Sequence, residues 1–179
     1  RDCLLSRGLG DVYKRQGQNS AYLREAQAKC LGIVPSSGMI ILTDIGDART
    51  IHPMEKETVG NRFAYMALGL TYGKKGFPVT GPLYKSMQIE GNKIAVSFDE
   101  VGKGLTTYRQ PLTGFEIAGE DRVFHPANAH LGKDAQTVVV SSPEVPHPVA
   151  VRYAFKDYVK GCLYNMFGLP VSSFRTDDW

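Results

Sequence analysis

The stretch EGNKIAVSFD, residues 90–99, alternates apolar and polar side chains with a period of two. Ile94, Val96 and Phe98 fall on one face of an extended chain, and the small or polar residues between them fall on the other. The letters EGN, residues 90–92, are typical of the turn of a hairpin. This stretch therefore predicts an antiparallel β-strand with one buried face.

More strands are predicted on the C-terminal side of this hairpin, separated by Gly, Pro and Asp. They cover residues 114–118, 122–125, 136–141 and 149–155. Short strands at this spacing predict a small antiparallel β-sandwich over residues 79–165. The remaining residues, 166–179, are aperiodic, and we expect Phe174 and Trp179 to anchor this tail to the body.

The pattern before residue 79 is that of an α/β protein. Residues 20–30, SAYLREAQAKC, predict a short helix with Ser20 as its cap and Leu23, Ala26 and Cys30 on one face. Residues 39–43, MIILT, form a continuous apolar run bounded by loop residues, which predicts a strand buried on both faces.

A second helix is expected after this strand. Pro53 suits the first turn of a helix, and apolar residues then recur at helical spacing up to Gly73, which suits its end. Residues 17–78 thus predict helix, strand and helix, as at the C-terminal end of an α/β/α domain.

The charge and composition exclude several function classes. The formal net charge is +3, but residues 1–16 carry four basic and two acidic side chains, which leaves +1 for the rest. No basic stripe with interleaved aromatics points to nucleic acid, and no apolar run is long enough to cross a membrane. No spacing of Cys and His predicts a metal site, and we expect no cofactor. Cys30 and Cys162 are expected to be buried free thiols.

The first sixteen residues, RDCLLSRGLGDVYKRQ, have no apolar period. The last six of them, DVYKRQ, resemble the translation of the transposon end used in preparing sequencing libraries. Residues 1–16 are therefore interpreted as a non-native, adapter-derived segment and are set aside from the fold.

His52 is the strongest catalytic candidate because it lies in the loop that leaves the predicted strand 39–43. Ligands of open α/β sheets bind beyond the carboxyl ends of the strands. A helix starting at Pro53 would disfavour the charged imidazolium and leave a ring ready to act as a general base. Asp47, or alternatively Asp44, could accept a hydrogen bond from the other ring nitrogen and orient the histidine. A helix-flanking histidine without chemistry is the alternative.

Several blocks of the chain, in this order, resemble one enzyme family. They are LREAQ (23–27), TDIGDARTIHPMEKETVGNRFAYMALGLTYG (43–73), SSPEVPHPVAVRY (141–153) and GLPVSSFRTDDW (168–179). Together they look like the C-terminal part of a sialate O-acetylesterase of the SGNH (GDSL-type) hydrolase superfamily. The resemblance implies a secreted or periplasmic carbohydrate esterase that removes O-acetyl esters from sialic acids by Ser–His catalysis.

The resemblance implies that His52 is the catalytic histidine. Many SGNH enzymes carry an Asp three residues before that histidine, and this chain has Arg49 there, so Asp47 is taken as the orienting acid and Asp44 as the alternative. The family's Gly-Gln-Ser-Asn nucleophile block is absent. GQNS at 17–20 has a different order and no preceding strand, so the nucleophilic serine is expected to be missing from this chain.

Two other functions remain open for the β region. It could be a non-catalytic carbohydrate-binding module, although the sequence offers no obvious aromatic platform, or a purely structural cover. Arg152 could face a sugar acid or lie on the outer face of a strand. The remaining histidines, His125, His130 and His147, are expected to be surface loop residues.

Overall fold

The computed structural model describes residues 20–50 and 52–179, so the segment 1–16 lies outside the described residues. The helices are α2 (Ser20–Cys30), α3 (Lys56–Met66) and the π-helical turn η1 (Ala67–Thr71). The strands are β1 (Leu83–Glu90), β2 (Lys93–Asp99), β3 (Leu105–Thr106), β4 (Phe115–Ala118), β5 (Phe124–Pro126), β6 (Asn128–Leu131), β7 (Thr137–Ser141), β8 (Ala150–Tyr153), β9 (Tyr164–Asn165) and β10 (Phe174–Arg175).

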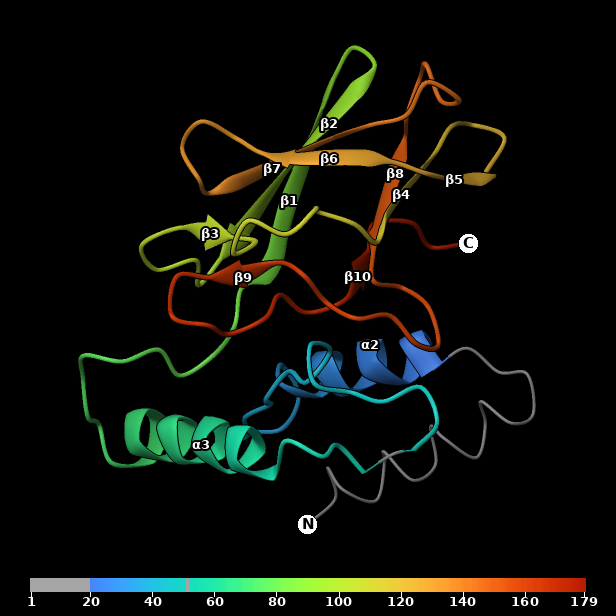
Figure 1. Ribbon diagram of the computed structural model, residues 1–179. Coiled ribbons are helices and arrows are strands. Elements are labelled where there is room, and N and C mark those ends of the chain that lie inside the picture. Colours follow the sequence, from blue (N-terminus) through green and yellow to red (C-terminus); the bar gives the residue numbers. More distant parts are fainter. Residues whose placement is uncertain (1–19, 51) are drawn as a thin grey trace.

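Two four-stranded sheets, in the orders β1-β2-β7-β6 and β10-β8-β4-β5, make up most of the molecule (Figure 1). Their strands pair antiparallel, as the alternation in residues 90–99 predicts. The hairpin is confirmed, because β1 and β2 pair up to Glu90 and Lys93 across the turn at residues 91–92. The pair β3-β9 forms a small third sheet.

Side chains from both four-stranded sheets build one apolar core. Ile94 and Val96 of β2 are fully buried, and Phe98 is 6% exposed. They belong to the same cluster as Ile117 of β4 and Val151 of β8. Burial of this much apolar side chain is the main stabilising contribution that the fold contains.

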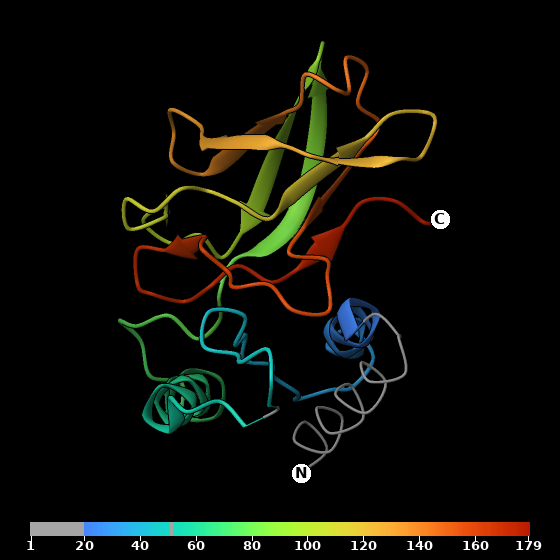
Figure 2. The same cartoon turned by 45° about the vertical axis from the view of Figure 1, so that its right-hand side comes forward.

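The two helices lie on one side of the sheets, next to β9 and β10, in both views of the molecule (Figures 1 and 2). Helix α2 begins at Ser20 and ends at Cys30, as predicted, but its expected buried face is wrong. Ala26 and Cys30 are exposed. The helix instead turns Arg24 inward, because backbone carbonyls of the β region offer that guanidinium hydrogen bonds, such as the one to Ala154 O at 3.0 Å.

The strand predicted at residues 39–43 does not form. Residues 37–42 have no regular secondary structure, and although Ile41 and Leu42 are buried, no described strand pairs with them. A strand needs hydrogen-bonding partners along its edge, and an apolar pattern alone cannot supply them.

Helix α3 begins at Lys56, not at Pro53 as predicted. Glu55 caps it without a side-chain hydrogen bond, and the residues between His52 and Glu55 form an irregular bend. The expected end is confirmed, since η1 stops at Thr71 and Gly73 follows with a φ of +63°, a conformation that glycine adopts readily.

The C-terminal tail is anchored more firmly than its aperiodic sequence indicates. Strand β10 pairs with β8, and Phe174 is buried with its ring stacked on Tyr84 at 4.8 Å between centroids. Trp179 is 37% exposed, and the guanidinium of Arg122 lies over its ring, 5.1 Å from the ring centroid.

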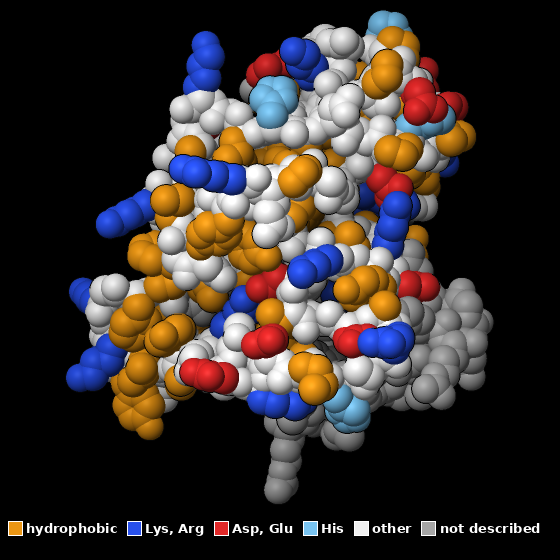
Figure 3. Space-filling view, viewed as in Figure 1, with side chains coloured by type: hydrophobic (Ala, Val, Ile, Leu, Met, Phe, Trp, Pro, Cys, Tyr) orange, Lys and Arg blue, Asp and Glu red, His pale blue; other side chains and the backbone are white. Residues whose placement is uncertain are grey.

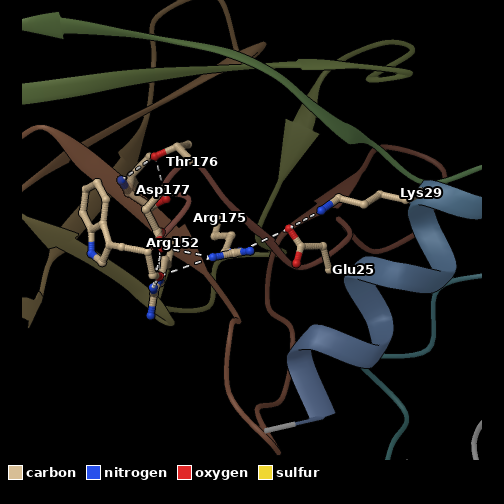
Figure 4. A network of polar contacts seen from close by, with 8 residues as sticks. Glu25, Lys29, Arg152, Arg175, Thr176 and Asp177 are labelled. Carbon is tan, nitrogen blue, oxygen red and sulfur yellow. Dashed lines mark hydrogen bonds and ion pairs between the residues drawn. The ribbon is translucent and has the colours of Figure 1, made fainter. Parts of the chain in front are cut away.

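A polar network joins this tail to helix α2 (Figure 4). Arg175 Nε donates to Glu25 Oε1 at 3.1 Å, and Glu25 also pairs with Lys29. Arg152 donates from Nε and Nη2 to the two carboxylate oxygens of Asp177, whose side chain has no exposed surface. Burial alone would raise the pKa of Asp177, but the hydrogen bonds and charge of Arg152 lower it below the ordinary value.

Replacing Asp177 by Asn tests this network. A carboxylate with a lowered pKa stabilises the fold above the ordinary carboxyl pKa, and that stabilisation is lost as the pH falls through the folded-state pKa. Asp177→Asn should lower the free energy of unfolding at pH 7 by about 1.5–3 kcal/mol. The difference from wild type should shrink below pH of about 4. Urea unfolding across pH measures both effects, with the exposed neighbour Asp178→Asn as control; equal curves for the two variants would contradict the expectation.

Candidate functional site

A buried ion pair holds the loop that follows the segment 37–42. Arg62 Nη1 and Nη2 donate to the two carboxylate oxygens of Asp44 at 2.8 and 2.6 Å, and both side chains are less than a tenth exposed. Arg62 Nη1 also donates to Ile41 O at 2.7 Å. A bidentate pair of this kind fixes geometry as well as charge, so helix α3 sets the position of residues 41–44.

The same loop is tied to the β region. Gly161 N donates to Thr43 O at 3.0 Å, and a Cβ atom at Gly161 would lie 2.7 Å from Thr43 Oγ1. Arg62 Nη2 reaches Gly168 O at 3.5 Å. Helix α3 and the loops at Gly161 and Gly168 therefore hold residues 43 and 44 in place. We call the Asp44–Arg62 pair the clamp.

His52 lies beyond this clamp and is exposed. Its backbone N–H donates to Thr50 Oγ1 at 3.2 Å, and its ring forms no hydrogen bond or ion pair with a described residue. Helix α3 begins four residues after His52, and the field of a helix terminus acts mainly within the first turn. The prediction that this terminus keeps the His52 ring neutral therefore has no support from the geometry. An exposed ring remains accessible to a substrate or a nucleophile.

Neither candidate acid contacts His52. Asp47 Oδ1 accepts a hydrogen bond from Arg49 N at 2.7 Å, and Arg49 Nε lies 3.8 Å from the same oxygen. Both oxygens of Asp44 bond to Arg62. Asp47 keeps one carboxylate oxygen without a described partner, so its orienting role stays a prediction.

Ser20 is part of the framework at the start of α2. Its Oγ lies 3.2 Å from Asp157 Oδ1 and 3.4 Å from Asp157 O, and its N–H donates to the same carboxylate. The rest of the GQNS block, residues 17–19, lies outside the described residues. Ser20 is the first described residue of α2, and its Oγ bonds to Asp157, so the predicted capping hydrogen bond to a helix N–H is not formed among the described residues.

The other candidate side chains are engaged elsewhere. Arg152 bonds to Asp177 and covers the Phe124 ring at 3.9 Å, so it does not face open solvent as a free charge. His125 is on strand β5 and its Nδ1 lies 2.9 Å from Glu144 Oε2, and His130 is on strand β6, so the prediction that these two are loop residues is wrong. His130 and His147 are exposed.

Three aromatic side chains that the sequence does not group together lie on or shortly after the paired strands β3 and β9. The rings of Tyr108 and Tyr164 lie 5.4 Å apart, and Phe167 packs over Gly102. Tyr108 is 53% and Phe167 46% exposed. Tyr164 Oη donates to Gly161 O at 3.1 Å, and Gly161 N donates to Thr43 O, so this ring lies close to the Asp44–Arg62 pair. Burial, followed by the negative charge of Asp44, raises the pKa of Tyr164. We call Tyr108, Tyr164 and Phe167 the aromatic group.

The backbone beneath the aromatic group is strained. Tyr108 and Arg109 adopt φ angles of +50° and +64°, in the left-handed region that non-glycine residues rarely occupy. Such residues cost energy and are frequent at functional sites.

Within residues 20–50 and 52–179, no group of three or more His, Cys, Asp or Glu side chains is placed to hold a metal ion. In the same part of the chain, no helix combines the length and apolarity that crossing a membrane requires.

Comparison with known proteins finds similarity to a solved enzyme structure. No family model matches the chain, and no curated protein matches it. The structure is similar to the crystal structure of a carbohydrate acetylesterase from Xanthomonas citri, with 39% sequence identity and a TM-score of 0.81. The match covers 89% of this chain and 36% of that protein, so this chain spans about a third of the length of the enzyme it matches.

This similarity agrees with the broad part of the sequence interpretation, a likeness to esterases that act on carbohydrates. The finer expectations, which are the SGNH superfamily, sialic acid as substrate and the Ser–His pair, remain predictions. The sequence interpretation missed the structural role of Arg62, although Arg62 lies inside the block 43–73 that carries the family resemblance.

Removing the acid of the clamp should destabilise the protein. Asp44→Ala leaves the buried guanidinium of Arg62 without its counter-charge, which should cost about 3–5 kcal/mol of unfolding free energy. Asp47→Ala removes a partly exposed carboxylate that contacts only Arg49 among the described residues, and should change stability by less than about 0.5 kcal/mol. Denaturant unfolding of both variants measures the difference, and similar losses would contradict the clamp.

Proposed function

We propose that this chain is part of a carbohydrate acetylesterase and supplies its histidine base, His52. The observation that carries the proposal is the similarity to the Xanthomonas citri enzyme over 89% of the chain. The exposed His52 ring, which has no partner among the described residues, supports its role as a group free to receive a proton. The serine nucleophile comes from sequence outside this chain, since the matched region is only 36% of that enzyme.

The reaction follows from these roles. The serine oxygen attacks the acetyl carbonyl while His52 takes the serine proton. The tetrahedral intermediate then expels the sugar oxygen, which receives the proton from His52. Water, deprotonated by His52, attacks the acetyl-enzyme, and the serine leaves with that proton as acetate is released. Asp47 is the proposed orienting acid, which requires its carboxylate to turn from Arg49 toward the ring.

The finer features of the proposal come from the family resemblance. The substrate is an O-acetylated sialic acid, and the enzyme is secreted or periplasmic. Residues 17–78 are the C-terminal part of an SGNH hydrolase domain, residues 79–165 an accessory β-sandwich domain, and residues 166–179 a tail that packs on the body. Arg62 then joins the hydrolase part to the tail through Gly168 O, and Thr43 O joins it to the accessory domain through Gly161 N.

The base assignment is tested in a chimera in which residues 20–179 replace the matching segment of the Xanthomonas citri enzyme. His52→Ala should lower kcat for p-nitrophenyl acetate on the order of 10⁴-fold or more, because a catalytic unit loses most of its effect when one member is removed. His130→Ala, which changes another exposed histidine, is the control and should leave kcat unchanged. Near-normal turnover of His52→Ala refutes the assignment.

The aromatic group favours a second candidate function, which is carbohydrate binding by the β region. Tyr108 is 53% and Phe167 46% exposed, and the charged residue Arg109 directly follows Tyr108 in the chain. Aromatic faces of this kind suit the apolar face of a sugar ring, and Arg109 suits a carboxylate such as that of a sialic acid.

Calorimetry of the 179-residue chain with an O-acetylated sialoside tests this candidate. Tyr108→Ala should weaken binding roughly three- to tenfold, as expected for the loss of one ring contact. The control is Tyr72→Ala, an exposed tyrosine that follows η1 and is remote in sequence from the aromatic group. The absence of binding heat from the unmodified chain, or equal effects of both variants, contradicts a binding role for the aromatic group.

A further inference from the structure

The loops around strands β3 and β9 are joined to one another at one end of the β region. Leu105 N donates to Ala135 O at 2.6 Å, and Met166 N donates to Gly104 O at 3.0 Å. The aromatic group lies on the segments that these hydrogen bonds bring together. We call this part of the molecule the β3–β9 end, and it comprises residues 100–110, 132–137 and 160–168.

Hydrogen bonds within its own turns hold the aromatic group in place. Asn165 Oδ1 accepts hydrogen bonds from Phe167 N at 3.1 Å and from Leu169 N at 3.0 Å, and these fix the turn that carries Phe167. Tyr108 N donates to Thr106 Oγ1 at 3.0 Å, which fixes the start of the strained loop. Side chains whose positions are set before binding lose little conformational entropy when a ligand covers them.

Two basic residues directly follow residues of this aromatic surface. Lys103 follows Gly102, where a Cβ atom would lie 2.8 Å from Phe167 Cε2. Arg109 follows Tyr108 and shares its left-handed backbone conformation. Both basic residues are exposed, and neither side chain has a hydrogen-bond or ion-pair partner among the described residues. Their charges are therefore available to an anionic ligand.

Two further basic residues lie on neighbouring segments of the β3–β9 end. Lys133 is in the turn that also contains Ala135. Lys160 precedes Gly161, whose carbonyl oxygen accepts the hydrogen bond from Tyr164 Oη at 3.1 Å. Both lysines are exposed and have no ion-pair partner in the part of the chain that the structure describes.

Positive charge exceeds negative charge on the β3–β9 end. Its acidic residues are Glu100 and Asp134, against the four basic residues. Asp134 Oδ1 already accepts hydrogen bonds from Gln136 N, Thr137 N and Thr137 Oγ1. In the space-filling view, Lys and Arg side chains project beside hydrophobic side chains at the left, over β3 and β9 (Figure 3). This surface therefore combines aromatic contact area with positive charge that no described acid pairs with.

We propose that the β3–β9 end binds an acidic polysaccharide, which is a chain of sugars that carry carboxylates. The aromatic side chains contact the apolar faces of the sugar rings, and the basic side chains pair with the carboxylates. A single acidic sugar brings one carboxylate, which can pair with only one or two of the basic residues, whereas a chain engages several at once. The proposal rests on the proposed function only in taking a carbohydrate as the ligand.

Binding of polygalacturonate to the 179-residue chain, measured by calorimetry, tests this proposal. Polygalacturonate carries a carboxylate on each sugar, and its fully methyl-esterified form has the same backbone without those charges. The acidic polymer should bind at least about tenfold more tightly than the ester at low ionic strength, and added NaCl should weaken its binding because salt screens exposed charges. Equal binding of the two polymers, or binding of neither, overturns the proposal.

A matched pair of double variants tests the basic residues. Lys103→Gln with Lys133→Gln removes two charges from the β3–β9 end, and Lys74→Gln with Lys75→Gln removes two exposed charges from the loop after η1. The first double variant should weaken polygalacturonate binding roughly three- to tenfold, and the second should leave it unchanged. All four lysines are exposed, so both proteins should fold like the unmodified chain. Equal effects of the two double variants overturn the proposal, because they indicate a general attraction of the acidic polymer to a basic protein.

Other ligands separate this proposal from the functions proposed above. If the O-acetylated sialoside binds in a way that depends on Tyr108 while the two polymers bind equally, the single-sugar candidate stands and the acidic polysaccharide is refuted. His52→Ala should leave polygalacturonate binding unchanged, so the proposed catalysis can fail without affecting this result. Single-stranded nucleic acid also binds to aromatic and basic side chains. Binding of oligodeoxythymidylate as tight as that of polygalacturonate overturns the proposal in favour of a nucleic-acid surface.

Discussion

The apolar core shared by the two four-stranded sheets is the constraint on which the remaining structure depends. It is built from alternate residues of strands that are distant in sequence, such as β2 and β8. The helices contribute little to it, since the buried apolar residues of α2 and α3 are only Ala21 and Met66. They are held instead by arginine side chains that reach carbonyl and carboxylate oxygens of neighbouring segments. Charge-assisted hydrogen bonds therefore position the part of the chain that carries His52, while hydrophobic burial stabilises the part beside it.

This division explains how much of the fold could be predicted from the sequence. The strands around Ile94 and Val140 can be predicted because buried residues alternate with less buried ones. Those around Ile117 and Val151 can be predicted from their apolar composition and the turn residues between them. The short strands β9 and β10 are missed because two residues carry no period. The segment 39–43 has the composition of a buried strand, but pairing depends on a neighbour that the described residues do not provide. In the β region, the local pattern thus predicts which residues are buried more reliably than it predicts which hydrogen bonds form.

The candidate site shows the same limit for polar residues. His52 could be selected as a candidate from its place in the loop and from the family resemblance. The residues that bind Asp44 and Asp47, which are Arg62 and Arg49, could not be predicted from the sequence. Arg62 follows Asp44 by eighteen residues and meets it only after helix α3 has folded onto the loop. The aromatic group combines residues separated by more than fifty positions. Contacts of this kind depend on tertiary packing, for which a single sequence has no signal.

The contacts that position the helices also determine the order in which the molecule can form during synthesis. Arg62 contacts Gly168, Arg24 contacts Ser173, and Glu25 contacts Arg175, so each early residue depends on one made more than a hundred positions later. A ribosome adds about 5–20 residues per second, and the helices emerge well before these partners exist. The loop with His52 can reach its final position only after nearly all of residues 20–179 have left the ribosome. Until then, the helical part has to be kept from aggregating by other means, such as chaperones.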